Sequence, residues 1–310
     1  MFSGSLREAY ATEAARSEAM RTPPPMTFDA SGPFPVHALT PRLRALGALL
    51  HAIVLGTLGY FTALLFGDVL AGTQDVQPGP LATGLAVGGL LPLIALRLLR
   101  LGTRATVTVR PEGLVLTQSG GAHFEIPFEA LASVHPWWLP VPGPGLTLKL
   151  RTGRAFAYGL ESQDPAPLLT AMGALGEARD HPLVRYAQAR SAKWRRRWYD
   201  WLLKYGLVPG VLAAIFFRAH QYISFGGPFG EWQMYGLKAY LFTFVRTWLP
   251  VFLALLLFGC FWRALAEALC FGAAWLGPRW ARRVRTGAEW TCRALYYVAL
   301  PVFLAVRLLG

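Results

Sequence analysis

Three shortages in the sequence limit what the protein can be. There is no asparagine, so the chain has no N-glycosylation site. The three cysteines, Cys260, Cys270 and Cys292, lie in or beside apolar segments without CxxC or Cys/His spacing, which predicts buried thiols rather than disulfides or zinc ligands. Charged residues make up only 15% of the 310 residues, against about 25% in soluble domains, and 54% are hydrophobic. The composition therefore predicts a membrane protein.

The patterns that carry catalysis or cofactor binding are also missing. The sequence contains no Walker A, GxGxxG, GxSxG, HExxH or EF-hand pattern, and no pair of carboxylates at a spacing that indicates catalysis. We therefore expect no cofactor and no metal, and lean against an enzyme. No nucleic-acid-binding module is recognisable, so nucleic acid is not an expected partner.

Positive charge, in contrast, is abundant and almost entirely arginine. The chain has 26 arginines and four lysines, and its formal net charge is +13. The arginines gather at the ends of apolar runs, where phospholipid headgroups are the nearest anions, so membrane phospholipids are expected partners. The bias toward Ala, Gly, Arg and Leu is typical of a GC-rich bacterial genome. We expect a multi-pass protein of a bacterial inner (plasma) membrane.

Apolar runs and turn signals divide the chain into five parts. Residues 1–43 have no apolar core of signal-peptide length and are expected to form a flexible cytoplasmic tail. Residues 44–100 hold two apolar runs joined by a loop without Lys or Arg, which predicts a transmembrane hairpin with both ends in the cytoplasm. A β-region follows at 104–178, then a basic tryptophan-rich helix at 179–204 and a C-terminal membrane region at 205–310.

The C-terminal region is expected to add about three spans to the hairpin. The count of five places the amino end inside and the carboxyl end outside. Two segments are marginal as spans: Gly206–Phe217 has only 12 uncharged residues, and Ala294–Val306 contains Pro301. Arg263 and Glu267, four positions apart, are expected to form a simple helix-surface pair.

The β-region alternates between strand-like runs and strong turn signals. "ATVTV", "LVLT", "HFEIPF", "LTLKL" and "RAFAYGL" are typical of short strands, and "PEG", "QSGG", "PGPG" and "RTG" of turns. "DPAPLLTAMGALGEA" predicts a helix that Asp164 can cap. The fold class we expect is an α-helical polytopic membrane protein with an inserted small β-barrel or sheet domain, its strands followed by one capping helix.

The β-region also carries a Glu-Gly turn before its second strand and an "I-P-[WF]-x-x-[LI]-x-x-V" stretch. The residues that match this stretch are Ile126, Pro127, Phe128, Leu131 and Val134. In both features the region resembles the bacterial PH-like domains that follow a transmembrane hairpin. The resemblance implies a PH-like fold on the cytoplasmic side and no particular activity. Phosphoinositide binding would need a basic loop between the first two strands, where this chain has Glu112.

One predicted connection between C-terminal spans, "RAHQYISFGGPFGEWQMYGLKAYLFTFVR", concentrates polar residues. Arg246 falls inside an apolar run, where an unpaired charge is costly, and Glu231 or a lipid phosphate would balance it. We predict an anion or headgroup site at the outer interface. Its candidate residues are Arg218, His220, Glu231, Lys238 and Arg246. The alternative is an aromatic belt with a snorkelling arginine.

Two further surfaces are candidates for contact. Tryptophans on one face of a basic helix predict binding to the anionic inner leaflet, and the alternative is a flank that only sets the topology. The candidates there are Lys193, Trp194, Arg196, Arg197, Trp198 and Trp201. In the β-region, adjacent tryptophans alternate faces of a strand, so the two should not both be core residues. At least one is expected to be a contact point for the membrane, a partner chain or the rim of the domain itself. The candidates for this platform are Trp137, Trp138, Lys149, Arg151 and Arg154.

These features lead us to expect a non-catalytic membrane protein that acts as an accessory or scaffolding subunit of an envelope complex. Its expected partners are other integral membrane proteins or a second copy of itself. The alternative is a transporter or lipid-handling protein that uses the outer polar site.

Overall fold

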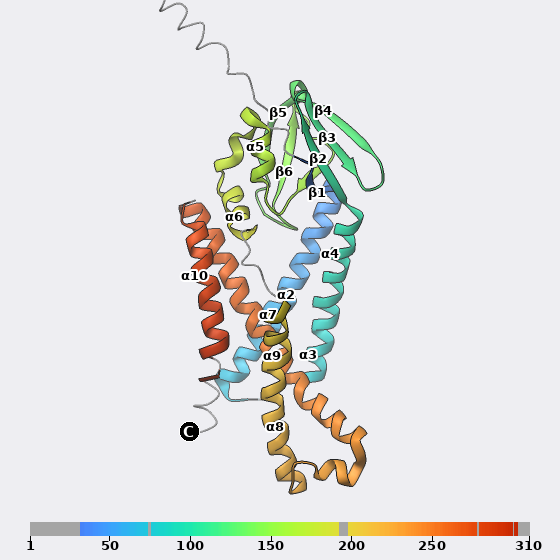
Figure 1. Ribbon diagram of the computed structural model, residues 1–310, viewed down its shortest axis with the longest axis vertical. Coiled ribbons are helices and arrows are strands. Elements are labelled where there is room, and N and C mark those ends of the chain that lie inside the picture. Colours follow the sequence, from blue (N-terminus) through green and yellow to red (C-terminus); the bar gives the residue numbers. More distant parts are fainter. Residues whose placement is uncertain (1–31, 74–75, 192–197, 278, 300, 303–310) are drawn as a thin grey trace, which may run out of the picture.

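The computed structural model describes residues 32–73, 76–191, 198–277, 279–299 and 301–302. A β-sheet module lies at one end of the long axis, and the long helices extend away from it (Figure 1). Three helices of the described residues are long and apolar enough to cross a membrane: Pro41–Ala71, the continuous Pro78–Gly102, and Gly230–Leu276.

The first two of these helices form the expected hairpin. Helix α2 (Pro41–Ala71) is capped at its start by Thr40 and ends at Gly72, whose φ of 71° favours glycine. The return helix consists of α3 (Pro78–Leu85), the π-helical turn η1 (Ala86–Leu90) and α4 (Leu91–Gly102). A Cβ on Gly88 would lie 2.3 Å from Thr57 Oγ1, so the glycine allows the two helices to pack closely.

The sheet is antiparallel and curled into a half-barrel. Its strand order is β4-β3-β2-β1-β7-β6-β5, and the terminal strands β4 and β5 are not paired with each other. The expected small barrel is therefore an open sheet. The strands are β1 (Phe34–Leu39), β2 (Arg104–Arg110), β3 (Gly113–Gln118), β4 (His123–Pro127), β5 (Leu131–Pro136), β6 (Gly145–Leu150) and β7 (Gly159–Glu161).

The central strand of the sheet comes from the part of the chain expected to be a flexible tail. Strand β1 lies between β2 and β7, with Phe34 opposite Val107 and His37 opposite Glu161. The prediction of a tail over residues 1–43 is therefore wrong for residues 34–43, because the buried side chains of Val36 and Ala38 make this segment part of the core. Residues 1–31 lie outside the described residues. The hairpin is thus inserted between the first two strands of the sheet.

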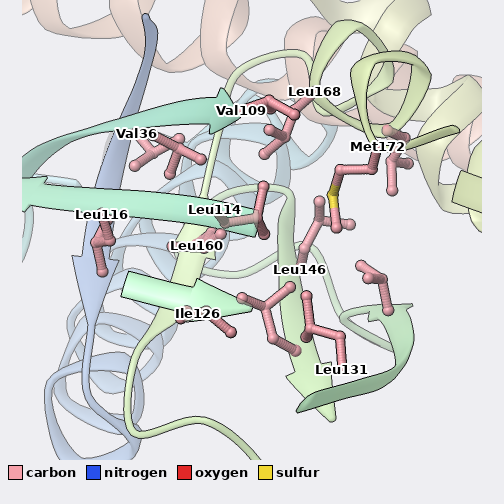
Figure 2. Close-up of a cluster of buried hydrophobic side chains, with 14 of the residues drawn as sticks. Val36, Val109, Leu114, Leu116, Ile126, Leu131, Leu146, Leu160, Leu168 and Met172 are labelled. Carbon is pink, nitrogen blue, oxygen red and sulfur yellow. The ribbon is translucent and has the colours of Figure 1, made fainter. Parts of the chain in front are cut away.

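The concave face of the sheet holds the hydrophobic core (Figure 2). Leu114 and Leu146 from the strands meet Leu168 and Met172 from the helical segment that covers this face (Figure 2). That segment contains α5 (Ala166–Ala171), the 3-10 turn η3 (Gly173–Asp180) and α6 (Pro182–Ser191). Asp164 Oδ1 accepts a hydrogen bond from the Ala166 N–H at 3.0 Å, as expected of a cap.

The remaining helices make up the C-terminal part of the chain. They are α7 (Trp198–Leu202), η4 (Leu203–Leu207), α8 (Val208–Phe225), α9 (Gly230–Leu276), α10 (Ala281–Ala294) and η5 (Leu295–Ala299). Helix α8 and the start of α9 form a hairpin at the end farthest from the sheet, and α9 bends at Gly236, where φ is 83° (Figure 1).

Only one helix of this region qualifies as a span among the described residues, where about three were expected. Helix α8 contains Gly206–Phe217 only in part, and Arg218 and His220 lower its mean hydropathy. The segment Ala294–Val306 extends past the described residues.

A buried ionic network joins α6, α9 and α10 near the sheet. The Arg285 side chain, 4% exposed, lies 2.8 Å from Glu267 and 2.9 Å from Glu289. Arg263 contacts the same two carboxylates, and the Tyr186 hydroxyl donates to Glu267 at 3.0 Å. Arg263 and Glu267 are therefore part of a larger network rather than a simple surface pair.

Candidate functional site

A cavity of about 670 Å³ lies where the sheet meets the helices. We call it the junction cavity. Its walls come from β1, β2, β7, α2, α4, α6 and α9, and from the loops at residues 143–144 and 162–163. The lining residues are His37, His51, Leu93, Leu96, Arg97, Arg100, Leu101, Arg104, Gly143, Pro144, Glu161, Ser162, Gln163, Arg190, Ser191 and Arg263.

Arginine dominates this lining. Arg97 and Arg100 are three positions apart near the end of α4, and therefore share one face of the helix. Arg104 follows as the first residue of β2, because the helix leads almost directly into the strand. Arg190 of α6 and Arg263 of α9 approach from other elements. Among the lining residues that the structure describes, five are arginines and Glu161 is the one acidic side chain.

The sheet contributes a polar row to the cavity. Arg104, His37 and Glu161 are register partners on β2, β1 and β7. Their neighbours along the strands, including Val36 and Leu160, belong to the hydrophobic core. Because side chains alternate along a strand, the three polar side chains point away from the hydrophobic core, toward the junction cavity.

An ion pair links α4 to this row. Arg100 Nη2 lies 2.7 Å from Glu161 Oε1 and also donates to the carbonyl oxygen of Pro142 at 3.1 Å. The Glu161 side chain is only 6% exposed. A Cβ on Gly143 would lie 2.2 Å from Glu161 Oε1, so the loop needs glycine where the carboxylate packs against it.

Three buried polar atoms of the lining residues have no hydrogen-bond partner among the described residues: Glu161 Oε2, Arg100 Nε and His37 Nδ1. Such an atom costs about 1–3 kcal/mol when it stays unpaired. Burial lowers the pKa of His37 below its ordinary value, although nearby Glu161 acts in the opposite direction. At neutral pH this imidazole is therefore neutral and offers one donor and one acceptor.

The cavity is suited to an anion with an apolar attachment. Arginine presents a planar set of donors that fits phosphate or carboxylate oxygens in bidentate fashion. Leu93, Leu96 and Leu101 supply apolar surface on the same helix as Arg97 and Arg100. A metal centre has no support within the described ranges, where no group of three or more His, Cys, Asp or Glu side chains is placed to hold an ion.

The predicted outer site does not form a cluster around its carboxylate. Glu231 is buried, but its partners are Gln221 and Thr243, which both donate hydrogen bonds to it. The four cationic candidates are exposed side chains on α8 and α9, namely Arg218, His220, Lys238 and Arg246. In the described part of the chain no carboxylate lies within salt-bridge distance of Arg246, and Arg218 lies over the ring of Tyr222.

The two platform tryptophans have opposite environments. Trp137 is buried, its Nε1 donates to Thr147 Oγ1 at 3.0 Å, and the Arg44 guanidinium lies 4.1 Å from its ring centre. Trp138 is 75% exposed. The two tryptophans are thus not both core residues, and the role of Trp138 as a contact point stays a prediction. The basic platform candidates are exposed as well, and they do not line the junction cavity: Lys149, Arg151 and Arg154.

The predicted inner-leaflet helix is described only in part. Trp198 begins α7, and Trp201 of the same short helix is exposed and packs against Tyr205. The other candidates lie outside the described residues: Lys193, Trp194, Arg196 and Arg197.

Sequence reasoning did not identify the junction cavity. In the sequence, Arg97, Arg100 and Arg104 are simply arginines at the end of an apolar run, and Arg190 and Glu161 belong to no recognisable pattern. The available signal was the three- and four-residue spacing of arginines that continues from a helix into a strand. Comparison with protein families, curated proteins and solved structures finds no match, so the site must be interpreted from its own geometry.

Proposed function

We propose that the protein is a non-catalytic membrane protein that binds a phosphate-bearing anion, the headgroup phosphate of a phospholipid, in the junction cavity. The observation that carries the proposal is the group of arginines in the lining. Arg100 is paired with Glu161, and Arg263 with Glu267 and Glu289. Among the described residues no carboxylate lies within salt-bridge distance of the other three, Arg97, Arg104 and Arg190. This lining holds like charges near one another, which is unfavourable. A bound phosphodiester would neutralise part of this charge and provide acceptors for the guanidinium groups.

The position of the cavity favours a lipid over a soluble anion. Arg97 and Arg100 occupy the last turns of the candidate span Pro78–Gly102, where headgroups meet the hydrocarbon. His51 lies ten positions into α2, about 15 Å from its start, so the cavity also continues along the apolar part of the helices. A phospholipid would match both the basic and the apolar wall.

We also propose that the sheet is a PH-like domain on the cytoplasmic side of a bacterial inner membrane. The proposed PH-like fold is supported by the seven antiparallel strands and the helix α5 that follows them. The absence of Lys and Arg from residues 72–77, between α2 and α3, supports this orientation, since Arg42, Arg44 and Arg100 lie at the opposite ends of these helices. The bound lipid would then belong to the inner leaflet.

The accessory or scaffolding role stays a prediction, and it is compatible with lipid binding. The adjacent exposed apolar side chains of Trp138 and Leu139 on the sheet module support this prediction.

Native mass spectrometry of the full-length protein, with retained phospholipids counted, tests the proposal. Arg97→Gln and Arg104→Gln should each weaken retention about 10-fold or more, because a hydrogen bond to a charged group contributes about 1.5–3 kcal/mol. Arg110→Gln is the matched control, since Arg110 lies on the same strand as Arg104 but does not line the cavity. Equal retention by all three variants would refute a headgroup site in the cavity.

A further inference from the structure

Glu161 is the unusual member of the junction cavity. A carboxylate weakens an anion site, yet this one is nearly buried among arginines. Its Oε1 is paired with Arg100, while its Oε2 is buried and has no hydrogen-bond partner among the described residues. An acceptor without a donor, placed beside a group of cations, points to a ligand that carries a hydrogen-bond donor next to its anion.

The charge around Glu161 favours a neutral donor. On the α4–β2 side of the cavity, Glu161 is paired with Arg100, and among the described residues Arg97 and Arg104 have no carboxylate within salt-bridge distance, so positive charge is in excess. An ammonium group would add a like charge to this excess. A hydroxyl group donates a hydrogen bond to Glu161 Oε2 without adding charge.

His37 provides a second position for such a group. It is the register partner of Glu161 on the adjacent strand, and its Nδ1 is also buried without a partner among the described residues. Glu161 Oε2 and His37 Nδ1 could therefore each accept a hydrogen bond from one of two adjacent hydroxyls. A glycerol headgroup carries two such hydroxyls.

We infer that the junction cavity selects a phospholipid with a hydroxylated headgroup of the phosphatidylglycerol type. Its phosphodiester lies on Arg97, Arg100 and Arg104, and its hydroxyls bind Glu161 and His37. Glu161 is then the residue that determines headgroup specificity. This inference rests on the proposed function, because it presupposes that the arginines hold a phosphodiester.

A pair of lipids with the same charged phosphodiester, of which only one carries headgroup hydroxyls, tests the inference. Phosphatidylglycerol and phosphatidylethanol have the same phosphodiester and the same charge, but phosphatidylethanol has no hydroxyl. Each lipid, with identical acyl chains, is titrated into the full-length protein and the bound fraction is measured by native mass spectrometry. Wild-type protein should bind phosphatidylglycerol at least 10-fold more tightly. Glu161→Ala should lower this ratio substantially while retaining phosphatidylethanol, and His37 still accepts one hydroxyl.

The possible results separate the inference from the proposal beneath it. Equal binding of the two lipids by the wild type, still weakened by Arg97→Gln and Arg104→Gln, overturns the hydroxyl inference and leaves the phosphate site intact. A preference for phosphatidylethanolamine overturns it in favour of an ammonium donor. Equally tight binding of soluble glycerol 1-phosphate overturns the assignment to a lipid. Retention that does not depend on either arginine overturns the proposed function itself. The wild-type comparison decides the question even if Glu161→Ala does not fold.

Discussion

Arg100 of α4 and Glu161 of β7 are 61 positions apart in the sequence, and their side chains form an ion pair of 2.7 Å. The pair joins the end of the helical hairpin to the sheet. Because Glu161 is nearly buried, the pair also determines where the one carboxylate among the described lining residues of the junction cavity lies. The position of this carboxylate determines what the cavity can bind, and the first prediction concerns it.

Arg100→Ala should destabilise the protein, because it leaves the Glu161 carboxylate buried without its cation. We expect a loss of about 1–3 kcal/mol, limited by the 41% exposure of Arg100, which lets water reach the pair. Thermal unfolding in detergent measures the loss. In a double-mutant cycle with Glu161→Ala, the coupling energy should be at least about 0.5 kcal/mol, and purely additive effects would contradict a direct interaction.

Gly143→Ala should disturb the cavity through a steric effect alone. The new methyl group would lie 2.2 Å from Glu161 Oε1, so either the loop or the carboxylate must move. We expect a destabilisation of about 1–3 kcal/mol and weaker lipid retention. Gly120→Ala is the control, since a Cβ there meets nothing within 4 Å. The same melting temperature for both variants would show that Gly143 does not pack against Glu161.

The stability of the protein should depend on pH through His37. Burial lowers the pKa of His37 below its ordinary 6.5, so the unfolded chain takes up the proton first. Stability should be constant above this pH and should fall as the pH drops below it. His37→Gln should lose less stability than the wild type between about pH 7 and pH 5. His181 also has a lowered pKa but is present in both proteins, so the difference isolates His37. If the melting temperatures of the wild type and His37→Gln fall by the same amount between pH 7 and pH 5, His37 does not cause the pH dependence.

Arg285→Met should be among the most destabilising substitutions in the C-terminal helices. It leaves Glu267 and Glu289 without the cation that lies within 3 Å of both. We expect a loss of about 3–5 kcal/mol, as for other broken buried ion pairs. Arg282→Met changes an exposed arginine of the same helix and should have little effect. Similar melting temperatures for the two variants would mean that the network contributes little to stability.

The hairpin could be predicted from the sequence because it depends only on local composition. Two apolar runs of spanning length predict two helices, and the structure has them at Pro41–Ala71 and Pro78–Gly102. Strand β1 could not be predicted in the same way. It is six residues long, contains Pro35, and pairs with residues more than 60 positions away, so its local sequence carries little of the reason for its structure.

The junction cavity was beyond prediction for a related reason. Its residues come from seven helices and strands, and the stretch 93–104 contains only three of its five arginines and lacks Glu161. The hydrogen-bond partners of Glu231 could not be predicted either. The charges in the sequence favour Arg246 as its partner, but in the structure the neutral side chains of Gln221 and Thr243 donate hydrogen bonds to it.

The most direct test of the account is a crystal structure of the full-length protein grown in a lipidic mesophase that contains phosphatidylglycerol. We predict a phosphate within hydrogen-bond distance of Arg97, Arg100 and Arg104, with the headgroup hydroxyls toward Glu161 and His37. Phospholipid ordered only along the outer surfaces of the helices, with water alone in the junction cavity, would contradict the account.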